Sequence, residues 1–140
     1  MHEFTTRRRI EFVDTDMGGI VHFSRFFVFM ETAEHQFLEA LGTSVHVEIE
    51  GKSVGWPRVA ASCEYESPAR FGDTLEIRVR VARKGRSSMT YDFSFTRGDV
   101  SIARGRMTSV CCVLEPGEEV RSIPIPAALR DLIEEAPERA

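Results

Sequence analysis

The sequence predicts an α+β protein in which an antiparallel sheet wraps around one long central helix. Apolar residues recur at helical spacing over residues 24–41, whereas apolar and polar residues alternate over residues 75–81 and 89–96. Such alternation is typical of an antiparallel sheet that buries one face. The chain has 140 residues, of which 42% are hydrophobic and 29% charged, so we expect residues 1–140 to form a single globular domain.

The first half of the chain is expected to form a strand, a loop and the central helix. Residues 4–13 are the expected strand, and residues 14–22 are a loop that contains two adjacent glycines. The helix over residues 24–41 has Ser24 at its N-cap position and Gly42 as its C-terminal stop. Its first turns are apolar on nearly all sides, so we expect most of its surface to be covered.

The second half is expected to form the sheet. A polar loop over residues 43–55 precedes about four long antiparallel strands, three of which are marked by their patterns: 75–81, 89–96 and 100–114. Prolines then mark a C-terminal tail, in which residues 127–135 are expected to form a short final helix and the tail extends to residue 140. Wrapping such a sheet around one helix gives the hotdog arrangement. It leaves a sheet edge and an apolar flank, which predicts a homodimer or a dimer of dimers.

Composition narrows the classes of function and compartment. The formal net charge of −4, from 18 Lys and Arg against 22 Asp and Glu, argues against binding nucleic acid through bulk charge. No apolar run approaches the ~18 residues that a membrane span needs. No apolar stretch follows Arg7–Arg9 as a signal peptide requires, and these arginines are expected to form a solvated edge. The odd number of cysteines fits buried thiols in a reducing cytoplasm.

The densest polar cluster, D-T-D-M-G-G-I-V-H over residues 14–22, precedes the central helix. A helix N-terminus offers unpaired N–H groups and partial positive charge, which can stabilise a developing oxyanion, and a nearby carboxylate can act as a base or nucleophile. Gly19 would let a substrate approach the backbone. The alternative is a connecting loop in which Asp14 and Asp16 form Asx-turns. Counted as an EF-hand, the loop has Arg25 where an acidic ligand is required, so no metal site is expected.

The stretch R-I-E-F-V-D-T-D-M-G-G-I-V-H-F-S-R-F-F-V-F-M-E-T-A resembles the signature of the 4-hydroxybenzoyl-CoA thioesterase family of hotdog proteins. The resemblance continues through Y-E-S-P-A-R-F-G-D and G-R-S-S to about residue 125. The nearest branch is that of the bacterial short-chain and aryl acyl-CoA thioesterases linked to the Tol–Pal envelope system.

The resemblance implies an acyl-CoA thioesterase that needs no cofactor beyond the CoA of its substrate. It implies that Asp16 is the catalytic carboxylate and that the backbone N–H of Phe23 polarises the thioester carbonyl. It also implies that the hairpin with Arg86 and Ser88 contacts the CoA phosphates, which suits their donors. The pocket would lie at the dimer interface.

Two positions leave the assignment open. His22-Phe23 departs from the family pattern, in which a polar residue commonly follows an aromatic one, and His22 could contact substrate or be hydrogen-bonded structurally. Glu31, which lies in the apolar part of the helix, could line the pocket or form a buried pair. Two other functions remain alternatives: a non-catalytic module that binds an acyl-thioester or a partner, and an enoyl-thioester hydratase.

Overall fold

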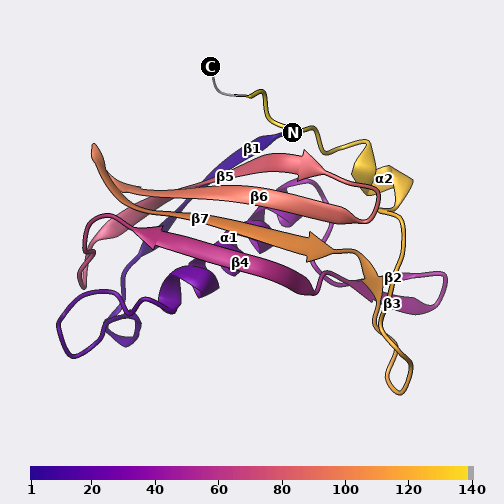
Figure 1. The fold of residues 1–140 in the computed structure, drawn as a ribbon, viewed down its shortest axis with the longest axis horizontal. Helices are drawn as coiled ribbons and strands as arrows, with labels where there is room; N and C mark the ends of the chain where they lie inside the picture. Colours follow the sequence, from indigo (N-terminus) through magenta and orange to yellow (C-terminus); the bar gives the residue numbers. More distant parts are fainter. Residues whose placement is uncertain (139–140) are drawn as a thin grey trace.

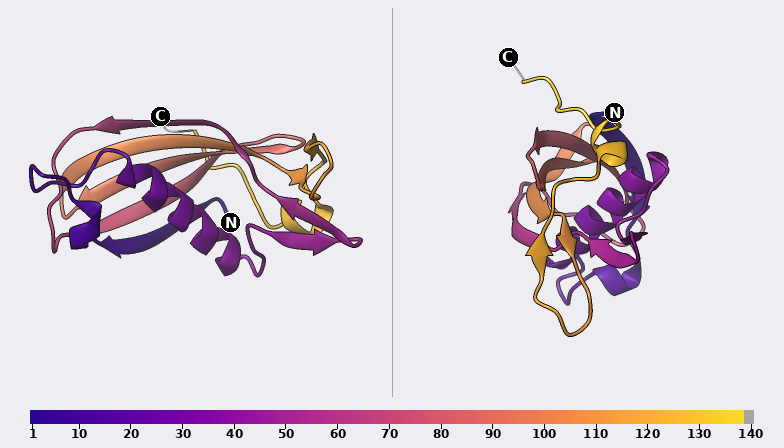
Figure 2. Two further views of the ribbon diagram at one scale, coloured as in Figure 1. Left: turned by 90° about the horizontal axis from the view of Figure 1, so that it is seen from below. Right: turned by 90° about the vertical axis from the view of Figure 1, so that its right-hand side faces the viewer.

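The computed structural model describes residues 1–138 and places one long helix, α1 (Arg25–Ala40), against one face of a curved antiparallel sheet (Figure 1 and the left view of Figure 2). The five strands of this sheet, in spatial order, are β1 (Glu3–Arg9), β5 (Thr74–Lys84), β6 (Ser88–Arg97), β7 (Val100–Val110) and β4 (Arg58–Tyr65). The predicted α+β hotdog arrangement is therefore confirmed. Among residues 1–138, no helix is both long and apolar enough to cross a membrane.

The strict alternation in β5 and β6 places every second side chain against α1. The eight inward-facing residues of these strands are all buried: Leu75, Ile77, Val79, Val81, Met89, Tyr91, Phe93 and Phe95. The intervening polar residues form the outer face of the sheet. One-sided burial of this kind fixes the register, because a shift by one residue would turn the apolar set toward water.

Helix α1 begins and ends close to the predicted positions. Its core face consists of apolar residues at helical spacing: Phe26, Phe29, Met30, Ala33, Phe37 and Leu38. At its C-terminus Gly42 has φ of +84°, and the N–H groups of Gly42 and Thr43 donate to the carbonyls of Glu39 and Leu38. These two bonds form a Schellman motif, in which glycine tolerates the left-handed conformation.

A second, small sheet corrects two expectations. The segment expected as a polar loop over residues 43–55 contains a hairpin, and the strand expected over residues 100–114 is divided at Cys111 between the two sheets. The small sheet consists of β2 (Val47–Ile49), β3 (Lys52–Gly55), β8 (Cys112–Val113) and β9 (Arg121–Ser122). The hairpin turns at Glu50 and Gly51, which both have positive φ. The three cysteines are free thiols.

The two ends of the chain also differ from expectation. Strand β1 ends at Arg9 rather than at residue 13, and Phe12–Asp14 form a short 3₁₀ helix, η1. Helix α2 covers only Ala127–Arg130. Beyond it, the backbone bonds to the body of the protein instead of continuing the helix, because the Ala136 N–H donates to the Val81 carbonyl at 2.8 Å. The last part of the expected tail, residues 139–140, lies outside the described residues.

Gly105 of β7 lies directly against the side chain of Met30 from α1. A Cβ atom at this position would lie 2.4 Å from the Sδ atom of Met30 and 3.2 Å from the carbonyl oxygen of Ser62. The backbone oxygen cannot move away easily, and Met30 is fully buried. The absence of a side chain at residue 105 therefore leaves the space that Met30 occupies between α1 and the sheet.

We predict that Gly105→Val lowers the free energy of unfolding by about 1–3 kcal/mol, because overpacking forces the helix away from the sheet. Urea unfolding followed by circular dichroism measures this difference. Ser94→Val places the same side chain on the outer face of β6, and we expect it to change stability by less than about 0.5 kcal/mol. Equal midpoints for the two variants would contradict this account.

Candidate active site

The loop over residues 14–22 is a tight hairpin between η1 and α1. Thr15 and Val21 form an isolated antiparallel bridge, and the Asp16 N–H donates to the Ile20 carbonyl at 2.8 Å. Gly19, with φ of +79°, closes the turn by donating its N–H to the Asp16 carbonyl at 3.0 Å. The hairpin therefore fixes the main chain of Asp16 opposite Ile20, in the segment that leads into α1.

Asp16 is exposed, and its carboxylate remains accessible. The Oδ1 atom accepts the Gly18 N–H at 2.8 Å, which is the Asx-turn that the connecting-loop alternative describes. This bond orients the side chain and leaves Oδ2 open to solvent or to a ligand. Structural and chemical roles for Asp16 are thus compatible.

The backbone N–H of Phe23 differs from those of its neighbours. The His22 N–H donates to the Asp14 carbonyl at 2.8 Å, the Ser24 N–H to His22 Nδ1 at 3.2 Å and the Arg25 N–H to the His22 carbonyl at 2.9 Å. Within residues 1–138, the Phe23 N–H has no such acceptor. It lies two residues before the start of α1, where the helix dipole adds positive potential. A carbonyl oxygen of a ligand is a suitable acceptor for this group.

The cap of α1 differs from the expectation. Ser24 occupies the N-cap position, but among the described residues its side chain makes no capping bond. Instead Nδ1 of His22 accepts the Ser24 N–H and lies 2.8 Å from Ser24 Oγ. The His22 ring also stacks on the Phe23 ring, with ring centres 4.5 Å apart. His22 is therefore hydrogen-bonded locally, which supports its structural interpretation and leaves its Nε2 available.

Asp14 is the carboxylate that the sequence did not single out for a special role. Its side chain is fully buried and accepts bonds from Arg8 (3.1 Å to each oxygen), Arg25 (2.8 and 3.0 Å) and the Glu11 N–H (2.9 Å). Burial alone would raise the pKa of Asp14, but these donors outweigh it and hold the pKa below its usual 3.8. Arg8, expected on a solvated edge, points inward, where its guanidinium lies 4.9 Å from the centre of the Phe29 ring.

The buried carboxylate on α1 is Glu34, not Glu31. The side chain of Glu31 is 53% exposed and lies 3.9 Å from Arg58, so the expected burial of Glu31 is wrong. Glu34, one turn further along, is buried between Arg58 and the hydroxyl of Ser109, which donates at 3.0 Å. Burial raises the pKa of Glu34 to about 7, although Arg58 and Ser109 favour the ionised form.

The expected phosphate-binding residues lie at the other end of the sheet. Ser88 pairs with Val110 of β7, whereas Tyr65, which hydrogen-bonds Phe23, pairs with Ala103. The distance along β7 between Val110 and Ala103 is therefore roughly 23 Å, at 3.3 Å per strand residue. Arg86 is exposed beside Ser88. One chain therefore places Asp16, Gly19 and His22 in one hairpin and Phe23 directly after it, but keeps Arg86 and Ser88 apart from them.

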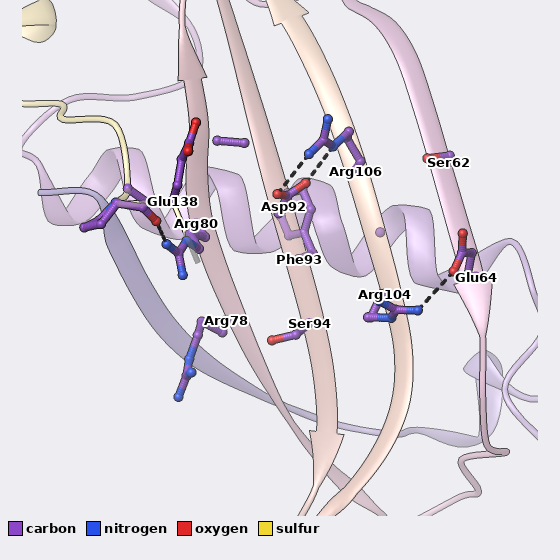
Figure 3. Close-up of a pocket in the computed structure, with 14 residues that line it drawn as sticks. Ser62, Glu64, Arg78, Arg80, Asp92, Phe93, Ser94, Arg104, Arg106 and Glu138 are labelled. Atoms are coloured by element: carbon purple, nitrogen blue, oxygen red, sulfur yellow. Dashed lines mark hydrogen bonds and ion pairs between the residues drawn. The ribbon is translucent and has the colours of Figure 1, made fainter. Parts of the chain in front are cut away.

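A large hollow lies elsewhere, on the outer face of the sheet (Figure 3). It has a volume of about 690 Å³ and is lined by arginines on β5 and β7 and by acidic residues on β4, β6 and the C-terminal tail. Arg106 forms two bonds with Asp92, at 2.7 and 3.1 Å, and Arg104 pairs with Glu64 at 3.3 Å. The charges of this face are largely paired within the chain, and none of the predicted site residues lines it.

Comparison with known proteins adds the family context. The profile described as the thioesterase-like superfamily matches residues 10–133. The 1,4-dihydroxy-2-naphthoyl-CoA hydrolase of Synechococcus elongatus is 29% identical over 96% of this chain and 97% of its own length. The 4-hydroxybenzoyl-CoA thioesterase of Pseudomonas sp. CBS-3 is 27% identical over 88% of this chain and 92% of its own. The structure of a gentisyl-coenzyme A thioesterase superposes with a TM-score of 0.79 at 28% identity, covering 91% and 99% of the two chains.

We predict that Asp14→Ala lowers the free energy of unfolding by about 3–5 kcal/mol at neutral pH, because it leaves two part-buried guanidinium groups without their anion. Since the pKa of Asp14 is lowered on folding, its contribution is present above the usual value of 3.8 and is lost as the pH falls through the folded-state value. The difference from the wild type should therefore shrink in acid. Denaturant unfolding at several pH values measures it.

Asp16→Ala is the matched control, because it makes the same change in the same loop at an exposed side chain. We expect a loss of less than about 1 kcal/mol for this variant. Equal losses for the two variants at neutral pH would show that the Asp14 cluster does not hold the loop.

Proposed function

Because this chain belongs to the thioesterase-like superfamily, and so to the thioester hydrolases, we propose that it hydrolyses acyl-CoA thioesters to the free acid and CoA. The observation that carries the proposal is the Phe23 N–H, which has no acceptor among the described residues and lies at the N-terminus of α1. The nearby exposed carboxylate of Asp16 supplies the second group that the reaction needs. No cofactor is required beyond the CoA of the substrate.

The proposed reaction begins with the thioester carbonyl bound to the Phe23 N–H. As the carbonyl carbon is attacked, negative charge develops on its oxygen, and a preformed donor at a helix N-terminus stabilises that charge more than it stabilises the ground state. The carbon–sulfur bond then breaks and CoA leaves as a thiolate. A thiol is far more acidic than an alcohol, so the leaving group needs little assistance from the protein.

Asp16 can act in two ways that give the same products. As a general base it removes a proton from water, whose oxygen attacks the carbonyl carbon. As a nucleophile its carboxylate attacks directly and forms a mixed anhydride, which water then hydrolyses. In both routes one water molecule is consumed, and the acid and CoA are released. The exposure of Asp16 supports access of water to the carboxylate in either case.

The relatives direct attention to aromatic acyl groups. The three proteins compared above are named for hydroxylated aromatic acyl-CoA substrates. We therefore propose an aryl acyl group as the first candidate, with short- and medium-chain acyl groups as the alternative. Gly19, His22 and Glu31 are the proposed contacts of the acyl end, because Gly19 and His22 belong to the same hairpin as Asp16 and the Glu31 side chain is 53% exposed.

A dimer would complete the site. One edge of β4 pairs with β7, and among residues 1–138 no strand lies along its other edge. That edge exposes small and apolar side chains, including Val59 at 62% and Ala61, and Val28 of α1 is 40% exposed. Such an edge is a template for pairing with a second copy. We propose a homodimer, alone or within a dimer of dimers, in which the partner supplies the CoA contacts of Arg86 and Ser88.

We predict that Asp16→Asn lowers the rate of thioester hydrolysis at least ~100-fold while the protein remains folded, because the variant lacks the base or nucleophile. Release of thiol from a panel of acyl-CoA substrates measures the rate, and the panel should include benzoyl, 4-hydroxybenzoyl, phenylacetyl, butyryl and octanoyl groups. Asp99→Asn makes the same change at an exposed aspartate in the β6–β7 turn and should keep full activity.

Turnover by Asp16→Asn at the wild-type rate would remove Asp16 from its proposed role. A folded wild type that binds CoA but hydrolyses no member of the panel would favour a binding module. Hydration of an enoyl-CoA without thiol release would favour the hydratase.

We further predict that Arg86→Ala raises the KM for acyl-CoA and leaves the hydrolysis of an acyl-N-acetylcysteamine thioester, which has no nucleotide, unchanged. The reason is that the guanidinium would pair only with the phosphates of CoA. Arg78→Ala, which removes an exposed arginine from the outer face of the sheet, should alter neither reaction. Equal effects of Arg86→Ala on both substrates would mean that Arg86 does not contact the nucleotide.

A further inference from the structure

The carbonyl of Phe23 is held by a side chain from a distant strand. The hydroxyl of Tyr65, at the end of β4, donates to the Phe23 carbonyl oxygen at 2.8 Å. The Tyr65 ring also packs edge-on against Phe26 of α1, with ring centres 5.4 Å apart. Tyr65 is 48% exposed, so its ring is not primarily a core side chain. Both of these contacts join the end of β4 to the segment in which α1 begins.

The amide end of Phe23 follows His22, whose N–H and carbonyl are both hydrogen-bonded, whereas the carbonyl end of Phe23 has few other restraints. Phe23 lies outside α1, and its side chain is 64% exposed. The Phe27 N–H, which is four residues further on, donates to the Ser24 carbonyl at 3.2 Å and not to Phe23. Within the described part of the chain, Tyr65 is thus the donor that the Phe23 carbonyl has in place of a helical N–H.

We propose that Tyr65 is a positioning residue for thioester hydrolysis, which keeps the Phe23 backbone oriented so that its N–H faces the substrate carbonyl. This inference rests on the proposed function of the Phe23 N–H. Tyr65 acts through the backbone and does not touch the reacting atoms. An oxyanion donor is effective only when its direction is fixed before the charge develops, so a loosened Phe23 backbone weakens the transition state more than the bound substrate.

Tyr65→Phe is the direct test, because it removes one hydroxyl and keeps the ring that packs on Phe26. We expect kcat to fall about tenfold, less than the 10²–10³-fold typical for loss of an oxyanion donor, since the N–H remains present. KM and the midpoint of thermal unfolding should stay close to those of the wild type. Tyr91→Phe makes the same change at the other tyrosine, in the core, and should leave kcat unchanged.

A binding measurement separates positioning from a merely structural role. Two unreactive CoA analogues serve as probes: a ketone in which a methylene replaces the thioester sulfur, and an alkyl thioether that lacks the carbonyl. Tyr65→Phe should weaken binding of the ketone severalfold and leave binding of the thioether unchanged. Calorimetry on the folded variants measures both affinities.

Each outcome has a definite meaning. A kcat within twofold of the wild type, or equal weakening of both analogues, would overturn the positioning role of Tyr65. If the wild type hydrolyses no acyl-CoA and does not distinguish the two analogues, the proposed function itself fails. The two failures are therefore distinguishable.

Discussion

The ion cluster around Asp14 is the interaction on which the candidate site depends. A fully buried carboxylate is bound by Arg8 from β1 and by Arg25 from the first turn of α1, so one side chain joins the edge strand to the helix. The backbone carbonyl of Asp14 also accepts the His22 N–H, and this bond fixes the residue just before Phe23. A buried charge of this kind is costly unless its partners are well placed. The geometry that satisfies Asp14 is thus also the geometry that orients the end of the hairpin.

A second polar contact crosses the core at the middle of the helix. Glu34 reaches Arg58 at the start of β4 and Ser109 of β7, close to the place where the chain passes from β3 of the small sheet into β4 of the large sheet. Between these two anchors the buried side chains of α1 are apolar, and Gly105 leaves room for Met30. Directional contacts at two points and non-directional packing between them define both the position of the helix along the sheet and its rotation.

Periodicity predicted the central helix and the inner strands, because burial on one face leaves a repeat that the sequence displays directly. The errors lie where long-range contacts override local pattern. Strand β1 ends early since Arg8 and Arg25 draw Asp14 inward, and neither partner is adjacent to it in sequence. The helix pattern is apolar nearly all round, so it could not show which of Glu31 and Glu34 is buried. The buried one is the residue that faces Arg58, and the position of Arg58 depends on the path of β4. Spacing indicated the chemistry of residues 14–23 but not their distance from Arg86.

The alternating positive and negative charges on the outer face of the sheet affect how the protein can aggregate. Across neighbouring strands, Glu3 faces Arg80, Arg80 faces Asp92, and Asp92 faces Arg106, so acid and base alternate along a row. Such a face stays hydrated, and stacking it on a second sheet would require stripping water from several ions at once. Ordered aggregates grow both by pairing edges and by stacking faces. A chain with an open sheet edge and a hydrated sheet face can therefore pair edge to edge with a neighbour, while the face-to-face stacking that a fibril needs is disfavoured.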